Sequence, residues 1–188
     1  LSGTNTFIMG VVKMPEADIA LWGVAFQVIT AITSMYDPIT TSLYPHVAAK
    51  KDYKTVLKVS AVLTPLVAVG CALVYFLADF VVLILAGKEY MEAATVLRCL
   101  VPLALFAFVA QMMGFPLLGA VGKQAQVTAS TVISAVFHLI GMGVLIAAGV
   151  FSLYSLSALR VVSEFVLMAV RIGFVVAFVR GVNKKQTL

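Results

Sequence analysis

Apolar stretches of roughly 20 or more residues recur along the whole chain, and only short polar breaks separate them. A helix of about 20 apolar residues is long enough to cross a hydrocarbon layer about 30 Å thick. The stretches therefore predict an all-α, polytopic membrane helix bundle with five complete transmembrane helices. The expected spans are residues 19–43, 56–85, 93–120, 124–148 and 153–179.

The composition also indicates a bilayer environment. The 188 residues are 62% hydrophobic and only 11% charged. A water-soluble domain of this size needs a largely polar surface and cannot bury so much apolar side-chain area. Because the breaks between the spans are too short for a soluble domain, we predict a single membrane domain over residues 1–188, in contact with the lipid bilayer.

The first segment predicts part of a sixth span. Its apolar run, residues 7–12, is too short to cross a bilayer or to serve as a secretory signal. The printed chain does not begin with methionine. We expect this run to be the end of a transmembrane helix that starts upstream, in a protein of which this chain is a part.

Basic residues mark the connections between the spans. In multi-pass proteins the basic residues of short loops are retained on the cytoplasmic side. If the loop after the first span is cytoplasmic, alternation of the spans also places these basic loop residues inside: Lys50, Lys51, Lys54, Lys58, Lys123, Arg180, Lys184 and Lys185. Only Lys13 and Lys88 then lie outside, beside acidic residues. We expect a cytoplasmic C-terminus, and lysines that mainly set the orientation.

Several classes of function find no support in the sequence. The net charge of +5 comes largely from residues that flank spans, and no basic and aromatic groove for nucleic acid is evident. Cys71 and Cys99 lie within expected spans, without a C-x-x-C motif or a His/Cys cluster, so we expect no metal or redox cofactor. Because no phosphate-binding loop, nucleophile motif or acid and base pair is found, we do not expect an enzyme.

Polar residues inside the spans follow helical periodicity. Steps of three and four place them on one face of four of the five helices. The stripes are Gln27, Thr30, Ser34, Asp37 and Thr41; Ser60, Thr64, Ala68, Cys71, Tyr75 and Asp79; Gln126, Ser130, Ser134 and His138; and Ser157, Arg160, Glu164 and Arg171. Because polar groups that face lipid are costly, the stripes should face one another or a water-filled space. We expect most serines and threonines to serve close helix packing.

Ionisable residues in the spans are the candidate functional residues. We expect Arg98 and Arg160 to line a cavity, and Arg171 either to line it or to extend to the interface. A guanidinium stays charged and donates two hydrogen bonds to a phosphate, so these arginines are candidate contacts of an anionic ligand. Candidates for coupling transport to protons or sodium are Asp37, Asp79, Glu164 and His138. A structural role is the alternative for each of these four, and Glu164 can neutralise Arg160 as its i, i+4 partner.

Prolines within the expected spans are Pro38, Pro65, Pro102 and Pro116. Each removes a backbone hydrogen bond and permits a kink or a broken helix, as in the binding sites of transporters. Gly114, Gly119 and Gly122 permit close backbone approach. Together with the polar stripes, these residues favour a transporter of a solute or a lipid.

Three passages resemble the C-terminal half of bacterial polysaccharide flippases. In "SLYPHVAAKKDYKTV", residues 42–56, a tyrosine and a proline close a span before a basic loop. In "GKEYMEAATVLR", residues 87–98, a glycine and an aromatic residue precede A-x-x-x-L-R. In "LLGAVGKQ", residues 117–124, a small residue precedes Gly-Lys. The chain thus resembles the O-antigen-type polysaccharide flippases of the multidrug, oligosaccharidyl-lipid and polysaccharide exporter superfamily.

The resemblance implies a two-lobed protein in which this chain is most of the second lobe and an N-terminal lobe is missing. It implies alternating-access transport of an isoprenoid-pyrophosphate-linked oligosaccharide across the bacterial inner membrane, for surface polysaccharide biosynthesis. Basic cavity residues would contact the pyrophosphate, here Arg98 and Arg160, with Arg171 as a third candidate. The implied partners are the lipid-linked glycan, the missing lobe and the polysaccharide polymerase machinery.

Other functions stay open. A multidrug exporter of the same superfamily would bind an amphipathic cation in a cavity dominated by acidic residues, whereas Arg98, Arg160 and Arg171 favour an anionic lipid substrate here. A lipid II flippase is another relative with the same architecture. A non-transporting membrane scaffold is the alternative from a different class.

Overall fold

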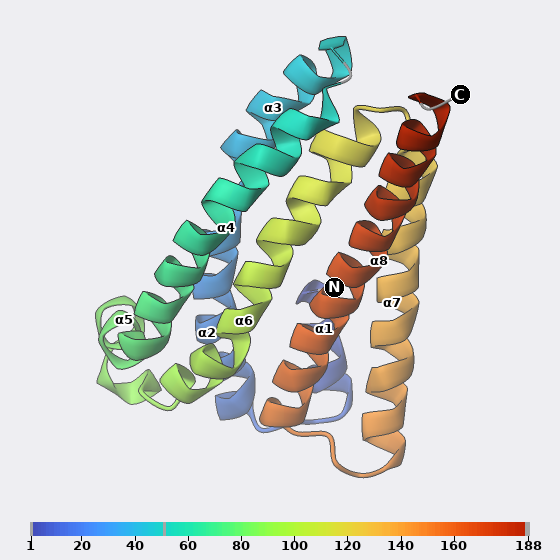
Figure 1. Cartoon of the computed structure of the whole chain (residues 1–188). Coiled ribbons are helices and arrows are strands. Elements are labelled where there is room, and N and C mark those ends of the chain that lie inside the picture. Colours follow the sequence, from blue (N-terminus) through green and yellow to red (C-terminus); the bar gives the residue numbers. More distant parts are fainter. Residues whose placement is uncertain (1, 51, 187–188) are drawn as a thin grey trace.

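The computed structural model describes residues 2–50 and 52–186, and within these ranges the chain is helical without a strand (Figure 1). The helices are α1 (Ser2–Val11), α2 (Glu16–Ser34), α3 (Asp37–Lys50), α4 (Tyr53–Phe76), α5 (Ala78–Ala86), α6 (Ala93–Met112), α7 (Gln124–Ala147) and α8 (Leu153–Gln186). A short 3₁₀ turn (Lys88–Tyr90) precedes α6, and a π-helical turn (Met113–Gly119) follows it.

Five helical segments among the described residues are long and apolar enough to cross a membrane. They are Glu16–Lys50, which comprises α2 and α3, Tyr53–Phe76, Ala93–Gly119, Gln124–Ala147 and Leu153–Val182. The all-α class and the number of helices long enough to span a membrane are therefore confirmed, and the five helices indicate a multi-pass membrane protein. α8 extends beyond the expected end of its span, to Gln186.

α6 is the central helix of the bundle. It packs against α2 and α4 on one side and against α8 on the other, and α7 packs against α8 (Figure 1). Leu97, Leu100 and Ala104 of α6 are buried in one apolar cluster with Trp22 of α2. Phe108 of α6 lies in a second cluster, with residues of the π-helical turn. α6 can take this place because its sequence is apolar on nearly all sides.

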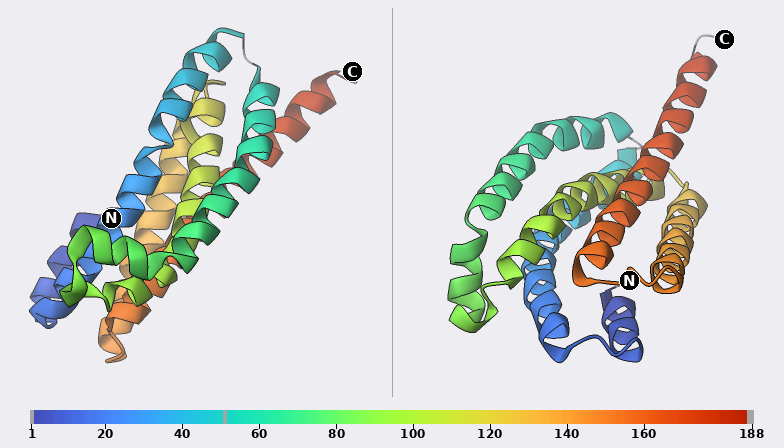
Figure 2. Two further views of the ribbon diagram at one scale, coloured as in Figure 1. Left: turned by 90° about the vertical axis from the view of Figure 1, so that its left-hand side faces the viewer. Right: turned by 90° about the horizontal axis from the view of Figure 1, so that it is seen from below.

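The expected span 56–85 is not a single helix, which corrects the sequence-based prediction. α4 ends at Phe76, and α5 runs across the end of α4 instead of continuing it (Figure 2). Arg98 of α6 lies at this corner, where its Nε donates a hydrogen bond to the carbonyl oxygen of Tyr75 (3.3 Å) and its Nη2 pairs with Asp79 (2.6 Å). These contacts tie both sides of the break to α6.

Two further breaks lie within spans and coincide with prolines. Between α2 and α3, the amides of Met35 and Tyr36 form tight i−3 hydrogen bonds, and Pro38 follows at the second position of α3. After α6, the π-helical turn contains Pro116 and the non-helical backbone of Gly114 (φ −76°, ψ −111°). Proline cannot donate the helical hydrogen bond and clashes with the preceding turn, which accounts for both breaks. Pro65 and Pro102 lie inside α4 and α6, respectively, without such a break.

The connections between helices gather at two ends of the bundle. The end of α3, the start of α4, the connection from the π-helical turn to α7 and the last turns of α8 lie at one end (Figure 1). The α1–α2, α5–α6 and α7–α8 connections lie at the other end (Figure 1). The spans therefore alternate in direction, as the charge-based topology requires.

Candidate functional site

A groove with polar and apolar lining residues runs along α2 and α3, where these helices face α1, α6 and α8. It has three sections, which we name by one residue each. The Trp22 section measures about 560 Å³, the Arg160 section about 290 Å³ and the Phe115 section about 540 Å³. Phe26 and Thr30 line both of the first two sections, and Gln111 and Arg171 line both of the last two. The shared residues show that the sections adjoin.

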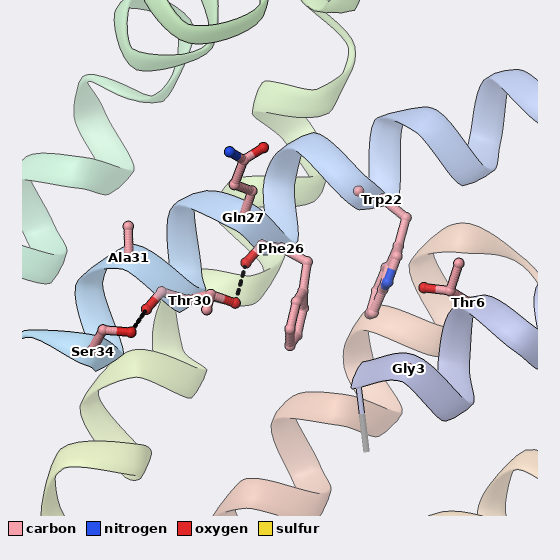
Figure 3. Close-up of a pocket in the computed structure, with 9 residues that line it drawn as sticks. Gly3, Thr6, Trp22, Phe26, Gln27, Thr30, Ala31 and Ser34 are labelled. Atoms are coloured by element: carbon pink, nitrogen blue, oxygen red, sulfur yellow. Dashed lines mark hydrogen bonds between the residues drawn. The ribbon is translucent and has the colours of Figure 1, made fainter. Parts of the chain in front are cut away.

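The Trp22 section lies between α1 and α2 (Figure 3). The rings of Trp22 and Phe26 stack with their centroids 5.5 Å apart and extend to the same side of α2 (Figure 3). The hydroxyls of Thr30 and Ser34 donate to the carbonyl oxygens of Phe26 (2.9 Å) and Thr30 (2.8 Å). Each hydroxyl donor is therefore used within α2, and the oxygens keep acceptor capacity toward the groove.

The polar stripe of the first span lines the groove as the sequence predicts. Gln27, Thr30 and Ser34 line the Trp22 section, and Asp37 and Thr41 line the Phe115 section. The stripe stays on one side through the break between α2 and α3. The stripe therefore lines the groove over both helices.

In the Arg160 section, α8 contributes a nearly buried ion pair. Arg160 Nη1 lies 2.7 Å from Glu164 Oε2, and each side chain is only 11% exposed. The two residues are one helical turn apart, so the pair forms within α8. Arg160 Nε is buried and has no hydrogen-bond partner among the described residues. One N–H group of this arginine is therefore buried without a partner among the described residues.

Arg171 joins three elements at the boundary between the Arg160 and Phe115 sections. Its guanidinium donates from Nη1 to the carbonyl oxygen of Ala110 (2.7 Å), from Nε to Ser130 Oγ (3.1 Å) and from Nη2 to Thr131 Oγ1 (3.2 Å). All three acceptors are neutral, and no carboxylate of the described residues forms a salt bridge with Arg171. Its charge is therefore not neutralised by direct pairing, and it points inward instead of extending to the interface.

The break after α6 makes room for this guanidinium. A Cβ atom on Gly114 would lie 2.8 Å from Arg171 Nη1, which is closer than side-chain atoms normally approach. Glycine at this position thus permits the guanidinium to rest against the backbone of the π-helical turn. Turns of this kind are frequent at functional sites.

The Phe115 section combines polar and aromatic side chains. Gln111 Nε2 donates to Asp37 Oδ1 (2.7 Å), which joins α6 to the start of α3. Thr41 and Tyr44 of α3 and Phe115 of the π-helical turn complete the wall. The Phe115 side chain is exposed although it is apolar.

Arg98 and Asp79, both predicted as site residues, lie outside the groove. They form their own salt bridge at the corner of α4 and α5, with side chains 30% and 55% exposed. Neither lines any of the three sections. The charged residues that line the groove are Arg160, Arg171, Asp37 and Glu164. The groove therefore holds two arginines and two acids, so its lining is not dominated by arginine.

His138 joins helices instead of lining the groove. Its Nδ1 lies 2.8 Å from Ser163 Oγ of α8, and its Nε2 lies 2.7 Å from Asn5 Oδ1 of α1. Ser134 also donates to the carbonyl oxygen of Ser163 (2.7 Å). All four side chains are buried. The stripe of α7 therefore faces α8 and serves packing, as expected for its serines.

Sequence reasoning missed Asn5, Gln111, Tyr44 and Phe115. Gln111 is the one amide side chain in the apolar run of α6, and this was the available signal. Phe115 lies between Gly114 and Pro116, and the predicted helix kink at these two residues was the available signal for it. Among the described residues, no group of three His, Cys, Asp or Glu side chains is placed to hold a metal ion.

The groove offers fixed donors and acceptors, aromatic surface and one guanidinium without direct charge pairing, within a bundle of membrane-spanning helices. This arrangement suits the binding of a polar or charged group within the thickness of a membrane. When the chain is compared with protein-family models, curated proteins and solved structures, none matches it.

Proposed function

We propose that this chain forms one lobe of a two-lobed flippase. The protein moves an isoprenoid-pyrophosphate-linked oligosaccharide across the bacterial inner membrane for surface polysaccharide biosynthesis, by alternating access. The observation that carries this proposal is Arg171, a guanidinium in the wall of an intramembrane groove that is held only by neutral acceptors. The sequence passages that resemble polysaccharide flippases support it.

Arg171 suits an anionic headgroup because of its remaining hydrogen-bond capacity. A guanidinium has five N–H groups, and three of its nitrogens each make one hydrogen bond here. Phosphate oxygens are preferred partners of such a fork, and a bound pyrophosphate would supply the opposite charge. Arg160 adds a second guanidinium to the lining of the adjoining section.

The helix breaks on both sides of the groove provide points of movement. The first separates α2 from α3 beside Asp37, and the second is the π-helical turn beside Arg171. Discontinuous helices at binding sites allow transporters to open alternately to the two sides of the membrane. We place the α3–α4 connection and the C-terminus in the cytoplasm, since these segments carry most of the basic residues.

The N-terminal lobe would cover the groove, and α1 would be the end of the sixth span of this lobe. The Trp22 section lies against α1, so the covering lobe would close the groove along α2 and α3. The lipid bilayer surrounds the remaining helices, whose exposed side chains are mainly apolar.

One observation favours a second candidate, the export of an amphipathic cation. Asp37 lines the groove, and its carboxylate accepts a hydrogen bond from the neutral amide of Gln111. A carboxylate in that setting would attract a cation. The proposed flippase and this exporter differ in the compound that accumulates when the protein is lost.

The proposal is tested in cells that lack the complete gene. We expect lipid-linked glycan to accumulate on the cytoplasmic face of the membrane while surface polysaccharide is lost, because the carrier cannot cross. Complementation with Arg98→Gln should restore export, since this exposed pair lies outside the groove and surface ion pairs contribute only about 0–1 kcal/mol.

Normal surface polysaccharide in the deletion strain would contradict the flippase. Sensitivity of the same strain to cationic drugs would then support the second candidate. Loss of export with Arg98→Gln as well as with groove variants would show that export does not depend specifically on the groove.

A further inference from the structure

Phe115 is an apolar side chain that the fold holds in an exposed position. It is 63% exposed, whereas its neighbours in the π-helical turn, Met113, Gly114, Pro116 and Leu117, are buried. The Phe115 ring rests over Gly119, where an added Cβ would lie only 3.1 Å from Phe115 Cδ1. The absence of a side chain at Gly119 therefore lets the Phe115 ring pack against the backbone at residue 119.

The same turn places a guanidinium beside this ring. Gly114 leaves space for Arg171, and Gly119 leaves space for Phe115. Arg171 and Phe115 line the same section of the groove. The two glycines thus allow the Arg171 guanidinium and the Phe115 ring to line the same section of the groove.

Two more planar polar groups complete this wall. The Gln111 amide and the Asp37 carboxylate are joined at 2.7 Å, which restrains both side chains. A carboxylate has further acceptor sites, and an amide has a second N–H and an acceptor oxygen. Thr41 and Tyr44 add hydroxyl groups to the lining. The section therefore presents fixed donors and acceptors around an exposed ring.

These features match the chemistry of a sugar ring. A pyranose has a face of C–H groups that packs on an aromatic ring, and its edge carries hydroxyls that both donate and accept hydrogen bonds. Planar amide, carboxylate and guanidinium groups can each bind two adjacent hydroxyls. An isoprenoid or acyl chain would leave these polar groups unpaired, which is costly. The volume of about 540 Å³ lies in the usual range of ligand sites.

We propose that the Phe115 section binds a pyranose ring of the carried glycan. Phe115 packs on the C–H face, and Asp37 and Gln111 bind hydroxyls at the edge, beside the pyrophosphate contact of Arg171. The inference rests on the proposed function and adds where, and by which side chains, the sugar is recognised.

The test uses the full chain reconstituted in phosphatidylcholine nanodiscs and two radiolabelled probes. One is an isoprenyl pyrophosphate without sugar, and the other carries one N-acetylhexosamine. We expect wild type to bind the sugar-bearing probe about tenfold more tightly. Phe115→Leu should lose about fivefold to tenfold of affinity for that probe and none for the probe without sugar.

Control variants separate ring packing from folding. Phe80→Leu changes an exposed phenylalanine of α5 outside the groove, and it should bind both probes as wild type does. Phe115→Tyr keeps the ring and should retain the preference for the sugar-bearing probe. If Phe115→Leu folds poorly, a retained preference in Phe115→Tyr and a lost one in Gln111→Leu give the same test.

The outcomes distinguish this inference from the function on which it rests. Equal binding of both probes by wild type, or an equal loss for both probes in Phe115→Leu, would overturn the sugar site and leave the flippase standing. Binding of neither probe by wild type would contradict the proposed pyrophosphate contact itself. Competition of the sugar-bearing probe by a cationic amphiphile alone, without competition by the free sugar, would also overturn the sugar site.

Discussion

Arg171→Gln is expected to reduce glycan export roughly tenfold or more and to destabilise the bundle by about 2 kcal/mol. The substitution removes the charge without a direct ion-pair partner in the groove. It also removes hydrogen bonds to Ala110, Ser130 and Thr131, which tie α8 to α6 and α7. Export is measured as surface polysaccharide and as glycan retained on the cytoplasmic face.

Two further variants separate charge from geometry at this position. Arg171→Lys keeps the charge but cannot reproduce the fork, so we expect an intermediate loss of export. Gly114→Ala keeps the arginine but places a Cβ against Nη1, so it should weaken export by displacing the guanidinium. Arg180→Gln, near the exposed end of α8, is the matched control and should behave as wild type. Normal export by both Arg171→Gln and Arg171→Lys would remove Arg171 from the site.

Arg160→Gln alone is expected to destabilise the protein more than Arg160→Gln combined with Glu164→Gln. The single change leaves the nearly buried Glu164 carboxylate without its cation, at a cost of about 3 kcal/mol. The double change removes both charges and should cost about 1 kcal/mol or less. The midpoint of thermal unfolding in detergent should fall by roughly 5–10 °C for the single variant only.

Unfolding can be followed through the buried thiol of Cys71. In a Cys99→Ser background, a thiol-reactive dye labels Cys71 only as the bundle opens, because Cys71 is buried and Cys99 is exposed. Export is measured on the same variants. If the double variant is stable but does not export, Arg160 or Glu164 contacts the substrate. Equal destabilisation by the single and double variants would contradict the expected cost of leaving the Glu164 carboxylate unpaired.

The number and type of helices could be predicted because length and hydropathy alone determine whether a segment can cross a bilayer. The stripe from Gln27 to Thr41 was equally accessible, since polar side chains at steps of three and four share a helix face. Helix breaks near Pro38 and Pro116 were also predictable, because proline cannot donate the helical hydrogen bond. The break at Leu77 has no proline or glycine beside it to predict it, and the structure shows it in the Leu77 backbone (φ −94°, ψ 11°).

Which ionisable residues line the groove could not be predicted, because this depends on how each helix is rotated about its axis in the bundle. Arg98 and Arg160 are both arginines in spans, but Arg98 faces the corner of α4 and α5 whereas Arg160 faces α2. His138 shares a stripe with Ser130, yet its partners are Asn5 and Ser163 on two other helices. The side of α6 that carries Gln111 is likewise fixed only by how α6 packs between α2 and α8.

The central claim is that the groove along α2 and α3 holds water within the membrane, and cysteine accessibility tests it most directly. Thr30→Cys and Thr41→Cys place thiols in the first and last sections of the groove, in a background without Cys71 and Cys99. Val62→Cys is the control, since Val62 is 71% exposed on α4 and lines none of the three groove sections. The full chain in membranes is treated with a charged, water-borne thiol reagent that does not enter lipid.

The account predicts that the thiols at residues 30 and 41 react and that the thiol at residue 62 does not. It also predicts that an isoprenyl pyrophosphate slows the reaction at both groove positions. Thiols at residues 30 and 41 that are as unreactive as the one at residue 62 would show that lipid or protein fills the groove, and this result would contradict the account.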